Sequence, residues 1–188
     1  GAWVILGKFF MSKWVLLLRG INVGGKNKLP MADLKSLLTA EGALDVHTYI
    51  QSGNAVFSSS NLKADLFSQN LSKAIDNSHG FAPHCLLLNA KHFGLAIQNC
   101  PFPKENSSEK ILHFYFLSEA PSEIGVTNLD DLKIPSEQWS LVGSVFYLYA
   151  PDGFGRSKLA AKAEKILSVP ATVRNWRTVH KINDLLRD

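Results

Sequence analysis

The sequence lacks the patterns that mark the common metal, redox and nucleophilic centres. Its only two cysteines, Cys85 and Cys100, have neither metal-ligand spacing nor a CxxC arrangement. The six histidines form no HExxH pair, and no GxSxG motif occurs. We therefore expect no metal ion and no cofactor, and any catalytic residues stay unknown. So few cysteines favour a reduced, cytoplasmic protein, although a reactive thiol at Cys100 stays open as the alternative to a small buried apolar group.

Long hydrophobic runs are also missing, so no membrane partner is expected. Residues 1–10 precede Met11 and are apolar, but they are too short to span a bilayer and lack a basic leading region or a small-residue cleavage site. They are predicted to be a tag or leader outside the fold. The formal charge of +4 is mild. This charge fits a phosphate-bearing ligand. It is far from the dense stripe of lysine and arginine that a dedicated nucleic-acid binder carries.

What the sequence does contain is enough apolar material for a packed core, 46% of 188 residues, arranged as alternating strands and helices. In the first half, residues 13–19 form an apolar run typical of a buried strand. A helix is expected after Pro30, where Met31, Leu34 and Leu38 recur at helical spacing until Gly42. The remaining elements of this half are a hairpin of 46–51 and 55–58 turned at 52–54, a helix capped by Asn61 and ended near Gly80, and a strand over 83–89.

The second half repeats this order of elements. A short helix over 91–99 and a polar loop over 101–110 separate the halves. The elements expected after the loop are a strand over 111–117, a helix over 122–132, a hairpin of 139–142 and 145–149, a helix opened by Arg156, Ser157 and Lys158, an extended piece over 171–174 and a terminal helix from Trp176. We predict an α+β fold of two tandem ferredoxin-like (split βαβ) units packed together, spanning 11–100 and 101–188.

A glycine-rich basic segment follows the first strand. From Gly20 it nearly matches the P-loop pattern, with Gly25 and Lys26 in place, but Asn27 stands where serine or threonine should hold magnesium. In a P-loop the helix starts at the lysine, whereas Pro30 points to a later start. A nucleoside triphosphatase site is therefore disfavoured. An anion site survives, because glycines let the backbone approach an anion and lysines supply positive charge. A flexible connector with solvated lysines is the alternative.

Three other polar clusters are candidates for ligand contact, and each has a structural alternative. Gln51, Ser52 and Asn54 could bond a ligand or satisfy the backbone of their own turn. The helix start at 156–158 could cradle an anion or be a solvated first turn. The RNW run at 174–176 could bind a ligand, or its asparagine could cap the last helix while its tryptophan packs inside.

Three stretches of the chain resemble a bacterial family catalogued as domain of unknown function 1697. They are RGINVGGKNKLPMADLKSLL, TYIQSGN and TVRNWRTVHKI, and the likeness extends over 11–188. The resemblance implies tandem ferredoxin-like α/β units, in agreement with the order of elements. It implies no particular reaction.

Our first hypothesis is that a phosphate-bearing or other anionic small molecule binds where the two halves meet. The expected ligand-binding residues are Arg19, Gly20, Asn22, Gly24, Gly25, Lys26, Lys28, Gln51, Ser52, Asn54, Ser157, Lys158, Arg174, Asn175 and Trp176. The alternative is an RNA- or DNA-binding module that uses the basic loop and stacks bases on sheet aromatics such as Tyr115, Tyr147 or Tyr149. A scaffold or homo-oligomer without a small ligand is a third possibility, and the sequence leaves the oligomeric state open.

Overall fold

Each half of the chain forms its own four-stranded antiparallel sheet. The computed structural model describes residues 11–104, 109–122 and 125–188. Within it the chain divides into two units: one comprises the chain up to Gly94 together with Lys181–Asp188, and the other comprises Leu95–His180. Among the described residues, no helix combines the length and the apolar character needed to cross a bilayer.

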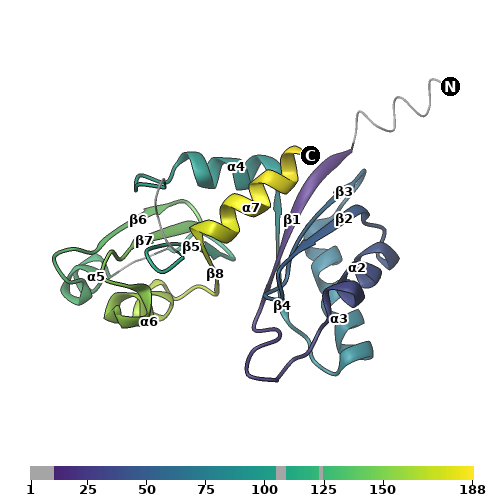
Figure 1. Ribbon diagram of the computed structural model, residues 1–188, viewed down its shortest axis with the longest axis horizontal. Helices are drawn as coiled ribbons and strands as arrows, with labels where there is room; N and C mark the ends of the chain where they lie inside the picture. The colour runs from purple at the N-terminus through teal and green to yellow at the C-terminus, as the bar shows by residue number, and fades with distance from the viewer. Residues whose placement is uncertain (1–10, 105–108, 123–124) are drawn as a thin grey trace. The chain divides into compact units, whose positions relative to one another are not determined.

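The first unit alternates strands and helices in the expected order. Its elements are β1 (Ser12–Arg19), α2 (Met31–Ala40), β2 (Leu44–Tyr49), β3 (Asn54–Ser59), α3 (Ala64–His79) and β4 (His84–Asn89). The strands lie in the order β2-β3-β1-β4, and β1 pairs antiparallel with both of its neighbours. Both α2 and α3 cover one face of this sheet (Figure 1).

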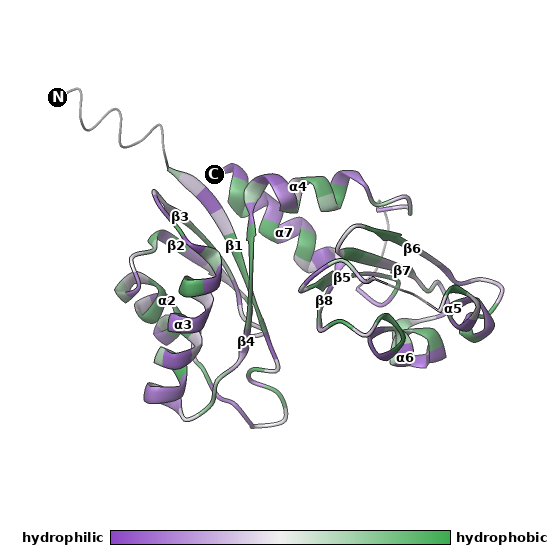
Figure 2. Ribbon diagram, turned by 180° about the vertical axis from the view of Figure 1, so that it is seen from behind, coloured by the Kyte–Doolittle hydropathy of each residue, from purple (hydrophilic) through white to green (hydrophobic). Residues whose placement is uncertain are grey.

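The core of the first unit lies between that sheet face and the two helices. Leu16 and Leu18 of β1 are fully buried, and they belong to the same cluster as Leu34 of α2 and Leu71 of α3. Figure 2 shows the central part of β1 as hydrophobic, whereas the helices carry polar residues on one side. Burying each such leucine contributes about 1.5–3 kcal/mol. The periodic leucines seen in the sequence are therefore what fixes the helices to the sheet.

The second unit has a sheet of the same strand order. Its elements are β5 (Leu112–Leu117), α5 (Val126–Leu132), β6 (Gln138–Val142), β7 (Val145–Tyr149), a 3-10 turn η1 (Phe154–Arg156), α6 (Lys158–Leu167) and β8 (Ala171–Asn175). The strands lie in the order β6-β7-β5-β8. The division between the units falls inside α4 (Ala90–Gln98) and inside α7 (Trp176–Arg187).

Aromatic side chains dominate the core of the second unit. Tyr115 meets Phe146 edge to face, with ring centroids 5.2 Å apart, and α6 supplies Leu159, Ala163 and Leu167 to the same cluster. The hydroxyl of Tyr115 donates to the carbonyl of Ala160 at 3.1 Å. This bond satisfies the one polar atom that the ring carries into the core.

The α+β class predicted from the sequence is confirmed, with two four-stranded antiparallel sheets and six α-helices in the described residues. The predicted cap at Asn61 is wrong: α3 begins at Ala64, and Lys63 at its N-cap makes no side-chain capping bond. The helix expected from Ser122 begins at Val126, since its first intrahelical bond runs from Leu129 to the Gly125 carbonyl. The predicted leader at 1–10, part of the polar loop at 105–108, and 123–124 lie outside the described residues.

Candidate functional site

The basic loop, which we define as residues 19–29, connects the end of β1 to α2. Its backbone folds back on itself: the Asn22 amide donates to the Asn27 carbonyl at 3.0 Å, and the Lys26 amide donates to the Val23 carbonyl at 3.0 Å. Val23 and Lys26 also form an isolated antiparallel bridge. The segment is a closed loop held by its own backbone hydrogen bonds, which argues against the alternative of a flexible connector.

Positive backbone angles explain the glycine content of the basic loop. Gly20, Gly24 and Gly25 have φ of 72°, 59° and 73°. A Cβ added at any of these three glycines would meet no atom within 4 Å. The backbone conformation, and not crowding, therefore favours glycine here. The space beside these glycines is open to an approaching ligand.

The side chain of Asn22 ties the basic loop to the turn between β2 and β3. Its Nδ2 donates to the carbonyls of Leu29 at 2.9 Å and Gln51 at 2.8 Å, and its Oδ1 accepts from the Leu29 amide at 2.8 Å. Asn22 also adopts φ of 53°, a conformation that asparagine tolerates better than most residues. This one residue closes the base of the loop and sets its position on the sheet.

The β2–β3 turn packs closely against the strand that leads into the basic loop. The Gly53 carbonyl accepts from the Leu18 amide at 2.8 Å, and a Cβ at Gly53 would lie 2.8 Å from both Leu18 Cβ and Ile21 Cδ1. Asn54 is fully buried, and its Nδ2 donates to the Tyr49 carbonyl and to the Ser52 hydroxyl, both at 2.9 Å. Asn54 and Ser52 thus stabilise their own turn, which is the structural role that the sequence allowed as the alternative to ligand binding.

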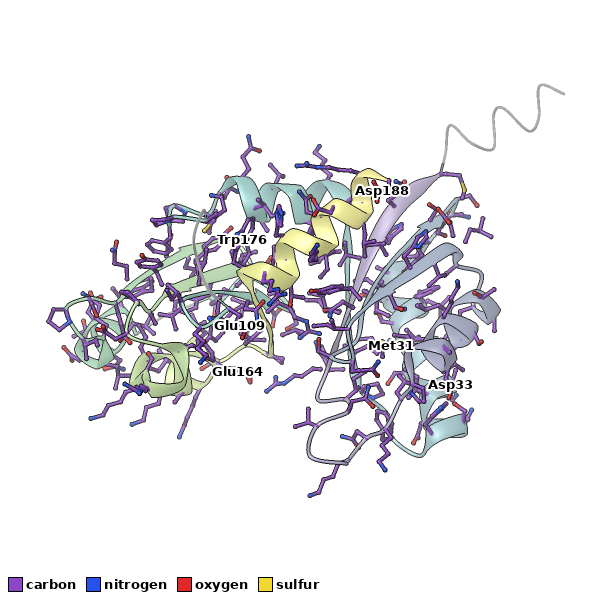
Figure 3. The ribbon with its side chains drawn as sticks, in the orientation of Figure 1. Met31, Asp33, Glu109, Glu164, Trp176 and Asp188 are labelled. Carbon is purple, nitrogen blue, oxygen red and sulfur yellow. The ribbon has the colours of Figure 1, made fainter. Side chains whose placement is uncertain are left out.

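Two lysines of the basic loop present their charge to solvent. Lys26 and Lys28 are exposed, and within the described chain neither forms an ion pair. Arg19, at the end of β1, is exposed as well. The helix that follows begins at Met31 (labelled in Figure 3), five residues after Lys26, with Pro30 at its N-cap. Because Pro30 has no N–H and Lys26 lies outside the helix, the P-loop geometry is absent.

In the second unit, two of the predicted ligand residues cap helices. The Ser157 hydroxyl accepts from the Ala160 amide at 3.0 Å and caps α6, whereas Lys158 is exposed in its first turn. The prediction that Arg156 opens this helix is wrong, because Arg156 ends the 3-10 turn η1 before it. Asn175 Oδ1 accepts from the Thr178 amide at 2.9 Å and caps α7.

Arg174 and Trp176 are held by the second sheet. Arg174 on β8 is only 9% exposed, and burial lowers its pKa to about 10 while its Nη1 donates to the Val173 carbonyl at 3.0 Å. The Trp176 ring (Figure 3) stacks on Phe114 with centroids 5.9 Å apart. Both side chains take part in the packing of this unit.

Two of the three tyrosines named as a stacking platform for nucleic-acid bases are buried in the second unit. Tyr115 is 2% exposed and Tyr147 is fully buried, with its hydroxyl donating to the Ala96 carbonyl at 2.5 Å. Bases stack on aromatic faces that reach solvent. The expectation that these two tyrosines are available to bases is wrong, because every residue of β5 and the three central residues of β7 are buried, so both faces of these strands are covered.

His113, which no sequence motif marks as functional, has an unusual environment. The residue is 8% exposed on β5, its ring stacks on Phe154 with centroids 3.7 Å apart, and its Nδ1 is buried without a hydrogen-bond partner in the described structure. Burial lowers its pKa to about 4. The signal was its place in an apolar strand, two residues from the core residue Tyr115.

Comparison with known proteins identifies a family and a structural neighbour. Residues 11–147 match the family described as "Protein of unknown function (DUF1697)". The structure is similar to that of the conserved bacterial protein SP0830 from Streptococcus pneumoniae, with a TM-score of 0.66 and 28% sequence identity, covering 94% of this chain and 99% of that one. No curated protein matches this sequence significantly.

Proposed function

This chain belongs to the DUF1697 family, whose function is unknown, and we propose that it binds a phosphate-bearing or other anionic small molecule at the basic loop. The observation that carries this proposal is the combination of exposed cations with a loop backbone whose conformation is fixed. A phosphate needs positive charge and outward-pointing backbone donors in a geometry that does not have to be assembled on binding.

The fold supports this proposal because it anchors the basic loop at one end of the first sheet. We propose that each unit is a ferredoxin-like split βαβ unit. The support is that β-α-β-β-α-β order and a β2-β3-β1-β4 sheet recur as β6-β7-β5-β8 in the second half. In such a unit the segment after the first strand and the turn of the central hairpin lie at one end of the sheet. The bond from Asn22 to the Gln51 carbonyl spans these two segments in the first unit.

Backbone donors add to the charge of the lysines. Gly24 and Gly25 are exposed at the tip of the loop, and within the described chain their amides donate to no protein acceptor. Successive amides around residues of positive φ form concave anion-binding surfaces in other proteins. An anion at this tip would accept from these amides while Lys26 neutralises its charge.

Backbone strain beside the loop points to the same place. Ile50, next to Gln51, has φ of 48°, which is strongly unfavourable for a β-branched side chain. Residues held in such conformations cluster at ligand-binding and active sites. The strained turn and the basic loop are joined by the side chain of Asn22, so the strain lies at the proposed site.

A thermal-shift screen with inorganic phosphate, nucleotides and sugar phosphates tests the proposal. A ligand at about 100 times its dissociation constant should stabilise the protein by roughly 2.7 kcal/mol. The double variant Arg19→Ala/Lys26→Ala should lose that shift, whereas Lys35→Ala, which removes an exposed cation from α2, should keep it. The proposal is refuted if no anion raises the melting temperature, or if the shift survives in the double variant.

A further inference from the structure

We propose that the basic loop and the β2–β3 turn together dock on the surface of a bilayer rich in anionic phospholipid, so that the bound anion is the phosphodiester of a lipid headgroup. This inference rests on the anion site proposed above and names the source of the anion. Two exposed apolar side chains beside the cations carry it.

These two side chains are Val23 and Ile50, which are 65% and 47% exposed. Val23 lies in the basic loop, Ile50 lies in the β2–β3 turn, and the Asn22 side chain bonds to the carbonyl of Gln51, the neighbour of Ile50. Both segments lie at the same end of the first sheet, because Leu17 near the end of β1 pairs with Asn54 at the start of β3. The surface therefore presents apolar side chains next to Arg19, Lys26 and Lys28.

A bilayer uses both kinds of group, whereas a soluble phosphate or a nucleic acid uses only the charged one. A soluble phosphate would contact the cations and leave the exposed valine and isoleucine in water. Nucleic acid would also leave them unused, because aliphatic side chains do not stack on bases as aromatic rings do. At an anionic lipid surface the cations meet the headgroups while short apolar side chains enter the headgroup–acyl boundary. Charge and apolar exposure together thus favour the lipid surface.

The conformation of Ile50 gives a further reason to assign its side chain a role. Asparagine or glycine would adopt φ of 48° with less strain. An exposed isoleucine at this position stabilises nothing in the first core, since it is absent from the buried cluster. Its branched apolar side chain becomes useful once it is removed from water by a second surface.

Co-sedimentation of the full chain with phospholipid vesicles tests this inference. Binding is expected to vesicles of equimolar phosphatidylglycerol and phosphatidylcholine, to be absent with pure phosphatidylcholine, and to weaken as salt is added. Lys26→Ala should lower the partition coefficient about fivefold, as expected for one basic residue at an anionic surface. Lys35→Ala on α2 is the matched control and should leave partitioning unchanged.

The variant Ile50→Asn separates docking from folding. It should lower partitioning several-fold and raise the melting temperature, because asparagine relieves the backbone strain at this position. Leu66→Asn is its control: Leu66 is 53% exposed on α3 and lies outside the proposed surface. If Leu66→Asn weakens partitioning as much as Ile50→Asn does, the assigned surface is wrong.

The outcomes also distinguish this inference from the anion site on which it rests. If the protein fails to sediment with the anionic vesicles while phosphate or a nucleotide still raises its melting temperature, the lipid inference is overturned and the anion site stands. Binding to single-stranded RNA without binding to vesicles overturns the lipid inference as well. If vesicles and soluble anions both fail to bind, both proposals are overturned.

Discussion

Replacing Asn22 by alanine should destabilise the first unit by about 2.5–4 kcal/mol, from the loss of three hydrogen bonds and the strain at φ 53°. Two of the bonds go to the partly buried backbone of Leu29, and the third goes to the Gln51 carbonyl near solvent. A typical intramolecular hydrogen bond contributes about 0.5–1.5 kcal/mol net to stability. The solvent-exposed bond to Gln51 belongs at the low end of that range. The left-handed conformation adds roughly 1 kcal/mol for alanine.

Asn22→Asp is the informative companion variant because it keeps the size of the side chain. Aspartate tolerates positive φ and still accepts from the Leu29 amide, but it cannot donate to the Leu29 and Gln51 carbonyls and turns a negative oxygen toward them. We expect a somewhat smaller loss of stability than in the alanine variant, about 2 kcal/mol, from the two lost donor bonds. A purely space-filling role for Asn22 would instead leave this variant as stable as the wild type.

Urea unfolding with linear extrapolation, together with hydrogen exchange at the Leu29 amide, would measure both effects. The midpoint should fall with little change in the slope m, and exchange at Leu29 should accelerate in Asn22→Ala, because its acceptor is gone. A destabilisation below about 0.5 kcal/mol, the range of ordinary surface substitutions, with unchanged exchange at Leu29 would refute the assignment of Asn22 as the residue that closes the loop.

Three further substitutions test other parts of the structure. Gly53→Ala should destabilise by about 2–4 kcal/mol in urea unfolding, because its Cβ would lie 2.8 Å from Leu18 Cβ and Ile21 Cδ1 at φ of 89°; a neutral result would mean that the turn does not pack as closely as described. His113 is kept neutral by burial, with its pKa lowered to about 4. The unfolded state takes up a proton near pH 6.5 that the folded state resists, so stability present above that pH is lost as the pH falls toward 4, by up to about 3 kcal/mol. The free energy of unfolding should therefore fall less between pH 7 and pH 4.5 in His113→Gln than in the wild type. An equal fall in both proteins would contradict this assignment. Asn175→Ala should cost about 1 kcal/mol through loss of the α7 cap, whereas Asn175→Ser should restore most of it; equal stability of the alanine variant would show that the cap contributes nothing.

The sequence predicted the parts of the fold that depend on local patterns. Leu34 and Leu38 at helical spacing located α2, and the Gly80 stop was right because the C-cap of α3 is left-handed there. The cap at Asn61 was wrong because several polar residues precede α3 and the pattern does not distinguish among them. Local chemistry also allowed the capping alternative for Asn175, which the structure confirms.

The roles that could not be predicted depend on contacts between distant segments. Asn22 bonds to Gln51, 29 residues away, and the sequence shows only an asparagine in a glycine-rich turn. His113 stacks on Phe154, which follows the next hairpin, so its burial is visible only when both are placed. Ile50 has a positive φ of 48°, which a β-branched residue disfavours. Its local propensity therefore predicts a conformation other than the one that the turn imposes.

The fixed shape of the basic loop should make Asn22 matter for binding even though the cations are elsewhere. Ordering the backbone of a flexible loop costs roughly 1–2 kcal/mol per residue, whereas an exposed ion pair returns only about 0.2–1 kcal/mol. If Arg19, Lys26 and Lys28 lay on a flexible connector, the cost of ordering it would cancel most of the free energy of binding an anion. On a preformed loop the same cations would attract the anion without that cost. Asn22→Ala keeps all three cations, so a titration with inorganic phosphate should show affinity lowered at least tenfold while Lys35→Ala binds normally. Unchanged phosphate affinity in Asn22→Ala would mean that charge alone makes the site and that the loop's internal hydrogen bonds serve only the fold.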